Sequence, residues 1–310
     1  MNQPVEIASG LQFPEGPVWM PDTTILCVEL QRRTVDRVHA DGRVEVIAQP
    51  GGSPNGLAIG PDGAAYVCNS GGWDFHELLG LNITKVEQPA DYSGGRIERV
   101  DLSSGEVRTL YTECDGHALR GPNDLVFDAD GGMWFTDHGK QRARDRDHGG
   151  VYYAAPDGSS IREVAYPLDA PNGIGLAPDG SRLYVAETFT GRVYWWPVTA
   201  PGVLGRPNPI GHGGNLLTGL PGFQLFDSLA VDADGNVVVA TLVTGALTVV
   251  SPDGEVLEQI PVGDPFVTNV CFGGEGLGTA FVTCSGTGRL VSLPYPRGGF
   301  ALGAPAATGS

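Results

Sequence analysis

Six short segments of the sequence carry an oxygen-bearing side chain at the same place in a repeated pattern. They read PEGPVW, PNGLAI, PNDLVF, PNGIGL, FDSLAV and TNVCF, and their second residues are Glu15, Asn55, Asn123, Asn172, Asp227 and Asn269. Carboxylate and amide oxygens suit hard divalent cations such as Ca²⁺, Mg²⁺ and Mn²⁺, whereas zinc and iron sites more often include His or Cys. If the fold brings the six positions together, they form a ring of oxygen donors for one metal ion.

A second interpretation applies to any one of these residues. Asn and Asp next to glycine are common turn residues, because their side chains bond to the nearby backbone. A repeated fold would preserve such a turn in every unit, so this interpretation stays open for Asn55 and Asn269. The two acids, Glu15 and Asp227, favour the metal, since a structural turn needs no buried charge.

Recurring apolar strands would position these residues. One strand is found six times, as ILCVE from Ile25, AYVCN from Ala65, MWFTD from Met133, LYVAE from Leu183, VVVAT from Val237 and AFVTC from Ala280. Most of these runs follow a turn built on Asp-Gly or a related pair, which is typical of hairpins. The apolar run before each turn carries the ring position, a third strand follows, and in most units a fourth. Four antiparallel strands repeated six times predict an all-β, six-bladed β-propeller whose first strands line the axis.

The ends of the chain suggest how the ring closes. The sixth unit has no fourth strand, because residues 295–310 show no strand pattern and are predicted to be a tail. The segment VEIAS, residues 5–9, precedes the first complete unit and has no partner of its own. We expect it to form the outer strand of the last blade, which removes a sheet edge. Residues 1–310 then make a single propeller domain.

Two connections between second and third strands are unusually long, at 70–95 and 138–150. In an antiparallel blade these connections rise at the mouth that holds the ring, so both segments are predicted to be lid loops. They bring Trp73 and His138 toward a ligand as candidate substrate contacts. The alternative is that both are tolerated surface insertions.

The composition restricts the partners and the compartment. Among 310 residues, 19 are basic and 36 acidic, for a formal net charge of −17, so nucleic acid and anionic membrane are not expected partners. The five cysteines fit no zinc or disulfide spacing and are expected to be free thiols. Without a signal-like start or a membrane-span-length apolar run, we expect a cytoplasmic protein.

Four longer motifs resemble a known family. FPEGPVW, RGPNDLVFDADGGMWFTD, APNGIGLAPDGSRLYVAET and FDSLAVDADGNVVVAT are similar to motifs of the gluconolactonase and regucalcin (senescence marker protein) family, which also contains luciferin-regenerating enzyme. The resemblance implies a six-bladed propeller with one divalent cation held by Glu15, Asn123, Asn172 and Asp227. The cation could be Ca²⁺, Zn²⁺, Mg²⁺, Mn²⁺ or Fe²⁺.

The resemblance also implies a metal-dependent lactonase that acts on a small-molecule lactone. The metal would polarise the carbonyl, Asp227 would assist the attack of water, and Arg120 matches an arginine of sugar-binding members. Asn55, Asn123 and Asn269 are candidate substrate contacts. Ser228, where many members have glycine, and the apolar 70–95 segment leave open a lactone less polar than a sugar lactone. Two alternatives remain: organophosphate or ester hydrolysis on the same metal, and a propeller that binds metal or protein without catalysis.

Overall fold

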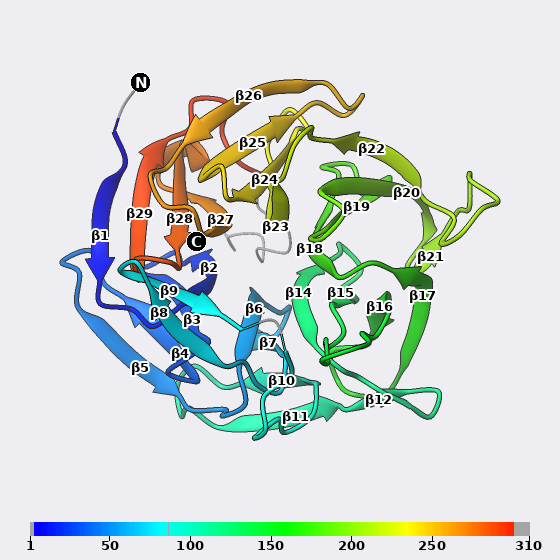
Figure 1. Cartoon of the computed structure of the whole chain (residues 1–310), viewed down its shortest axis with the longest axis horizontal. Helices are drawn as coiled ribbons and strands as arrows, with labels where there is room; N and C mark the ends of the chain where they lie inside the picture. Colours follow the sequence, from blue (N-terminus) through cyan, green and yellow to red (C-terminus); the bar gives the residue numbers. More distant parts are fainter. Residues whose placement is uncertain (1–2, 86, 301–310) are drawn as a thin grey trace, which may run out of the picture.

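The computed structural model describes residues 3–85 and 87–300, which form a closed ring of six antiparallel sheets around a central axis (Figure 1). The predicted six-bladed β-propeller is therefore confirmed. Each blade begins with a strand beside the axis. These innermost strands are β2 (Pro14–Trp19), β6 (Pro54–Ile59), β14 (Pro122–Phe127), β18 (Pro171–Leu176), β23 (Leu225–Val231) and β27 (Val267–Gly273).

The remaining strands continue each blade outward in sequence order. The second strands are β3 (Ile25–Glu29), β7 (Ala65–Asn69), β15 (Met133–Asp137), β19 (Arg182–Glu187), β24 (Val237–Leu242) and β28 (Thr279–Cys284). The third strands are β4 (Thr34–Val38), β10 (Arg96–Val100), β16 (Gly149–Ala154), β20 (Arg192–Ala200), β25 (Ala246–Val250) and β29 (Arg289–Pro294). The outer strands of blades one to five are β5 (Val44–Ala48), β11 (Val107–Tyr111), β17 (Ile161–Leu168), β22 (Asn215–Gly219) and β26 (Val256–Pro261).

The sixth blade is completed by the other end of the chain. Strand β1 (Val5–Ser9) pairs antiparallel with β29, with Val5 opposite Ser292 and Ser9 opposite Arg289. This confirms the predicted closing strand, and Figure 1 shows β1 outside β29. The edge of β29 is thereby hydrogen-bonded instead of exposed. Of the predicted tail, 301–310 lie outside the described residues.

Apolar side chains between neighbouring blades hold the ring together. Between blades three and four, Trp134 and Val151 pack in one buried cluster with Leu183 and Trp196. Because strand side chains alternate between faces, each blade contributes apolar residues to both neighbours. All five cysteines are free, as expected.

Blade four differs from the prediction in its outer strand. A short strand, β21 (Val203–Leu204), pairs with the end of β20 before the chain reaches β22. The intervening segment interrupts the repeat, which explains why the sequence pattern did not indicate β22.

Three minor elements complete the described chain. They are the hairpin β8 (Phe75–Leu78) and β9 (Leu81–Thr84), the short pair β12 (Glu113–Cys114) and β13 (His117–Ala118), and the 3₁₀ turn Glu275–Leu277. Within 3–85 and 87–300, no helix has the length and hydrophobicity needed to cross a bilayer.

Candidate functional site

The pairing register of each innermost strand shifts at or beside its ring residue. The register with the second strand shifts between Glu15 and Val18 in blade one, and between Phe226 and Leu229 in blade five. Corresponding shifts occur beside Asn55, Asn123, Asn172 and Asn269. A bulge adds an unpaired residue and re-aims its side chain. This repeated irregularity, which the sequence did not reveal, leaves Asn55, Asn123, Asn172 and Asp227 outside the regular ladder. Glu15 and Asn269 pair with the second strand at the edge of the irregularity.

Glycines after the ring residues allow the innermost strands to approach closely. A Cβ on Gly16 would lie 2.8 Å from the carbonyl oxygen of Asn55, and one on Gly56 would lie 2.5 Å from that of Asn123. Real Cβ atoms do not come so near to backbone atoms. Gly16 also has a φ of 53°, a left-handed conformation that favours glycine. Glycine is thus needed at these positions to bring neighbouring ring residues together.

One hydrogen bond connects two further ring residues, and others hold Asn172 in place. Asn269 Nδ2 donates to Glu15 Oε2 over 2.8 Å, across the junction of blades six and one. Ser228 Oγ donates to Asn172 Oδ1 over 3.4 Å, and Asn172 Nδ2 donates to Thr188 Oγ1 over 3.1 Å. Five ring residues are buried, whereas Asp227 is partly exposed at the mouth. The structure therefore brings the predicted ring residues together around one mouth of the axis.

The acids of the ring influence one another. Burial raises the pKa of Glu15 well above its ordinary value, and the nearby Asp227 carboxylate raises it further, against the hydrogen bonds from Asn269 and Gly16. Burial also raises the pKa of Asp227 to about 7, although the Asn172 side chain lowers it. Both shifts describe carboxylates that are costly to ionise without a compensating positive charge.

A third acid, Asp124, belongs to this cluster and was not predicted. Burial raises its pKa to about 7, and its charge in turn raises the pKa of Glu15 and of Asp227. Asp124 Oδ1 accepts a hydrogen bond from the Leu125 backbone over 2.9 Å. The signal was present in the sequence, because Asp124 stands in PNDLVF where PNGLAI and PNGIGL have glycine.

The donor set fits a divalent cation. Asn123 Oδ1 is buried and lacks a hydrogen-bond donor among the described residues. Within 3–85 and 87–300, no Lys or Arg side chain forms an ion pair with Glu15, Asp124 or Asp227. A metal ion would compensate both the buried acceptor without a donor and the three acids without a cationic partner. Within 3–85 and 87–300, no three His, Cys, Asp or Glu side chains could hold a metal ion by themselves, so a site here would also need amide oxygens.

The two long connections meet above this mouth. Gln88 N donates to Gln141 O over 2.7 Å, and Lys140 Nζ donates to Gly72 O over 2.8 Å. The β8–β9 hairpin extends away from its own blade, since Asn82 N donates to Gly286 O over 2.8 Å. In Figure 1 this hairpin overlies blade one. The predicted lid loops thus contact each other and the loops of neighbouring blades.

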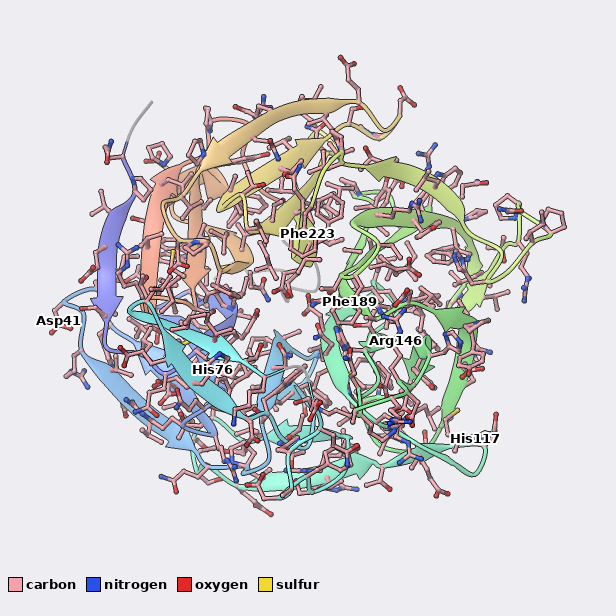
Figure 2. All side chains as sticks on the ribbon, in the orientation of Figure 1. Asp41, His76, His117, Arg146, Phe189 and Phe223 are labelled. Atoms are coloured by element: carbon pink, nitrogen blue, oxygen red, sulfur yellow. The ribbon has the colours of Figure 1, made fainter. Side chains whose placement is uncertain are left out.

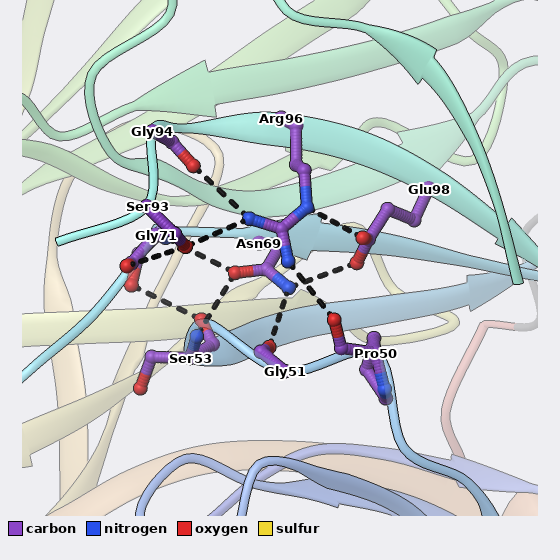
Figure 3. Close-up of polar contacts among 10 residues, drawn as sticks. Pro50, Gly51, Ser53, Asn69, Gly71, Ser93, Gly94, Arg96 and Glu98 are labelled. Carbon is purple, nitrogen blue, oxygen red and sulfur yellow. Dashed lines mark hydrogen bonds and ion pairs between the residues drawn. The ribbon is translucent and has the colours of Figure 1, made fainter. Parts of the chain in front are cut away.

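The bases of these connections are fixed by polar residues at the ends of second strands. In blade two, Asn69 Oδ1 accepts hydrogen bonds from Ser53 N over 2.9 Å and Gly71 N over 3.0 Å, while Nδ2 donates to Glu98 Oε2 over 2.8 Å (Figure 3). In blade three, Asp137 accepts from the backbone of Arg120 and Gly121, each over 2.7 Å. These buried bonds hold the mouth loops in one conformation.

Trp73 and His138 lie beside each other at the rim. Their ring centroids are 6.2 Å apart, and His138 is 5.7 Å from Phe189 of blade four. A cavity of about 10 Å³, enough for about one water molecule, lies among these rings and Lys140. Lys140 and Phe189 had no sequence signal, because their loops do not repeat.

Arg120 is at the mouth but exposed. Its carbonyl oxygen accepts a hydrogen bond from Tyr92 Oη over 2.7 Å, which joins it to the 70–95 segment. Within the described chain, its guanidinium has neither a hydrogen bond nor an ion pair, so it is available to a ligand.

A larger cavity lies on the opposite face of the propeller. Its volume is about 730 Å³, and turns 128–131, 177–180 and 198–201 line it with Pro61 and Phe300. None of the ring residues contributes to it, and the chemistry described above is confined to the other mouth.

Fold and site together define a six-bladed β-propeller with a ring of oxygen donors at one axial mouth. Residues 13–286 match the SMP-30/Gluconolactonase/LRE-like region. The chain belongs to this family, as its motifs predicted.

Individual relatives agree with this assignment. The gluconolactonase of Zymomonas mobilis is 27% identical over 317 residues, which cover 92% of this chain and 80% of that protein. Lactonase drp35 of Staphylococcus haemolyticus is 28% identical over 253 residues, which cover 81% of this chain and 70% of that protein. The crystal structure of regucalcin, a calcium-binding protein from Agrobacterium tumefaciens, covers 96% of both chains with a TM-score of 0.71 and 18% identity. That last similarity supports the fold.

Proposed function

We propose that this protein is a metal-dependent hydrolase that opens the ring of a lactone. Its distant relatives, a gluconolactonase and a lactonase, support lactone hydrolysis as the general reaction. The observation that supports the metal dependence is the group of acceptors at the mouth: within the described residues, the carboxylates of Glu15, Asp124 and Asp227 form no ion pair, and the buried Asn123 Oδ1 has no donor.

Glu15, Asn123, Asn172 and Asp227 are the residues that would hold the ion. Glu15 Oε2 accepts hydrogen bonds from Asn269 and Gly16, whereas Glu15 Oε1 and Asn123 Oδ1 have no hydrogen-bond donor among the described residues. A bound divalent cation supplies Lewis acidity toward the lactone carbonyl and its developing negative charge. The family also includes a calcium-binding protein, which is consistent with this all-oxygen set.

The residues of the chain supply the remaining chemistry. Asp227 is partly exposed at the mouth, where its carboxylate accepts a proton from the attacking water as the oxygen bonds to the acyl carbon. The ring C–O bond then breaks, and the proton passes to the leaving alkoxide to give a hydroxy acid. Arg120 orients the substrate from the rim, and the two lid loops limit the access of bulk water.

A reconstitution assay tests this function. The full chain is treated with a chelator, supplied separately with Ca²⁺, Mg²⁺, Mn²⁺, Zn²⁺ or Fe²⁺, and assayed against γ- and δ-lactones by acid release. We expect turnover with at least one ion and a loss of about 10²-fold or more in Asp227→Asn, whereas the surface control Asp179→Asn behaves as wild type.

The same assay, extended to esters and organophosphates and paired with a calorimetric metal titration, distinguishes the other functions. Equal activity in Asp227→Asn would remove this residue from its role. Turnover of esters or organophosphates without turnover of lactones would assign another hydrolysis to the site. Metal binding without any turnover would indicate a binding protein.

A further inference from the structure

Three loops around the mouth expose apolar side chains next to one another in the ring. Phe189 follows β19 and is 37% exposed, Phe223 precedes β23 and is 74% exposed, and Val243 follows β24 and is 51% exposed. All three loops open at the face that carries the ring of oxygen donors. Figure 2 shows Phe189 and Phe223 close to the propeller axis.

Hydrogen bonds fix these loops against one another. Leu220 N donates to Gly191 O over 3.4 Å, which joins the loop of Phe189 to the segment that carries Phe223. Thr244 Oγ1 donates to Gln224 Oε1 over 2.8 Å, which joins the residues next to Val243 and Phe223. The loops that carry the three apolar side chains are therefore joined to one another.

Aromatic contacts connect Phe189 to side chains of two further blades. Phe189 packs edge-on against His138 at 5.7 Å, and His138 against Trp73 at 6.2 Å. Burial lowers the pKa of His138 to about 4, so its ring is neutral at pH 7. We call Trp73, His138, Phe189, Phe223 and Val243 the apolar rim.

Two basic side chains next to the apolar rim, Lys140 and Arg146, contact other groups of the protein. Lys140 Nζ lies 4.3 Å from the centre of the Trp73 ring and donates to Gly72 O. The Arg146 guanidinium lies 5.3 Å from the Phe189 ring and forms an ion pair with Asp169 over 2.7 Å. Both basic side chains thus have partners within the protein, and burial lowers the pKa of Lys140 to about 7. This leaves the rim suited to an uncharged ligand group.

An exposed apolar side chain far from the mouth, such as Leu257 on the outer strand β26, needs no explanation. Apolar side chains grouped at the mouth of a candidate active site do need an explanation, because such groups commonly mark binding surfaces. A sugar lactone presents hydroxyl groups in every direction and would leave them facing these side chains. A hydrocarbon group would remove apolar surface from water on both sides.

We propose that the apolar rim binds a hydrocarbon substituent on the lactone ring, so that the preferred substrates are alkyl- or aryl-substituted lactones instead of polyhydroxylated sugar lactones. The reaction in this inference rests on the proposed function, whereas the substrate class rests on the apolar rim. The ring of oxygen donors would face the lactone group while the substituent lies against Phe189 and Phe223.

A chain-length series tests the substrate class. Metal-loaded full-length protein is assayed with γ-lactones that carry alkyl groups of one to seven carbons, and with glucono-δ-lactone. We expect kcat/KM to rise about two- to threefold per added methylene, less than full burial would give. Phe189→Ala and Phe223→Ala should flatten this slope, whereas Leu257→Ala, a matched truncation far from the mouth, should keep it.

A binding series separates this inference from the proposed function. The affinities of γ-lactams with the same alkyl groups, which are far more resistant to hydrolysis, are measured by calorimetry with the same variants. If lactam affinity rises with chain length and Phe223→Ala weakens it, but no lactone is hydrolysed, the apolar rim binds hydrocarbon groups and the proposed hydrolase function is rejected. If lactones are hydrolysed but kcat/KM does not change with chain length, or is highest for glucono-δ-lactone, the proposal that the apolar rim binds a hydrocarbon substituent is contradicted. A flat profile in both series would reject both proposals.

Discussion

Asn269 Nδ2 donates a hydrogen bond to Glu15 Oε2 over 2.8 Å, although the two residues lie 254 positions apart in the chain. The contact crosses the junction at which the last blade meets the first. It gives Asn269 a definite partner, a predicted metal ligand. The turn interpretation, which was left open for Asn269, is therefore incomplete, since its side chain serves a neighbouring blade as well as its own Val270 backbone.

Replacing Asn269 with Ala should weaken metal binding. The amide holds the Glu15 carboxylate in place, and outer groups that orient a metal ligand typically contribute 10- to 100-fold to affinity. We expect a loss of about tenfold in a calorimetric titration with Ca²⁺. Asn55→Ala is the comparison, because Asn55 occupies the equivalent position in blade two. A loss as large in Asn55→Ala as in Asn269→Ala would contradict the special role of the Glu15 contact.

Closure by β1 predicts a position-dependent effect on stability. Ala8 is 5% exposed and packs against the sixth blade, whereas Val5 on the same strand is 62% exposed. Ala8→Asp would bury an unpaired charge and should lower the free energy of unfolding by about 2–4 kcal/mol. Val5→Asp should change it by about 0.5 kcal/mol or less. Urea denaturation measures both, and equal effects would argue against a closed seam.

Asp36 on β4 should make stability depend on pH. Burial raises its pKa to about 7, with a further contribution from Glu29, against a hydrogen bond from Thr34. Because the folded-state pKa lies above the ordinary value of 3.8, the protonated form is favoured in the fold. Its stabilising contribution is complete below about pH 4 and is lost as pH rises through about 7.

Asp36→Asn isolates this effect. Relative to wild type, the variant should gain about 2–4 kcal/mol in unfolding free energy between pH 4 and pH 8. Asp41→Asn, at an exposed turn position of the same blade, is the matched control. A constant difference between Asp36→Asn and wild type across this range would show that Asp36 ionises normally.

The β8–β9 hairpin should affect substrate binding more than metal binding. Phe75 and Thr84 pair directly, so residues 76–83 can be replaced by two glycines. The ring of oxygen donors keeps its contacts, and we expect unchanged Ca²⁺ affinity with a several-fold higher KM. Asn82→Ala, which removes only the side-chain bond to Gln31, should have a smaller effect. A loss of metal affinity on shortening would show that the hairpin supports the ring itself.

Repetition explains what could be predicted from the sequence. Each innermost strand packs on its neighbours in the same way, so Glu15, Asn123 and their counterparts recur at one position and reveal the ring. The unpaired segment 5–9 likewise indicated the closing strand. Local hydrophobic patterns are sufficient for such features, because every blade meets the same requirements.

Features without repetition were missed. The contact between Lys140 and Gly72 depends on how two insertions of different length fold over the mouth, and neither has a counterpart in another blade. Phe223 stands alone in a connection without strand pattern. Asp124 was visible as an acid in place of glycine, but its closeness to Glu15 and Asp227 follows from the approach of neighbouring blades.

The most direct test of the metal site is a calorimetric titration of metal-free protein with Ca²⁺, using wild type, Glu15→Gln and Asp227→Asn. Each substitution removes one carboxylate charge from the ring with little change in side-chain volume. We predict one ion per chain in wild type and a loss of affinity of about 100-fold or more in each variant. Absence of binding in wild type, or equal affinity in all three proteins, would contradict the account.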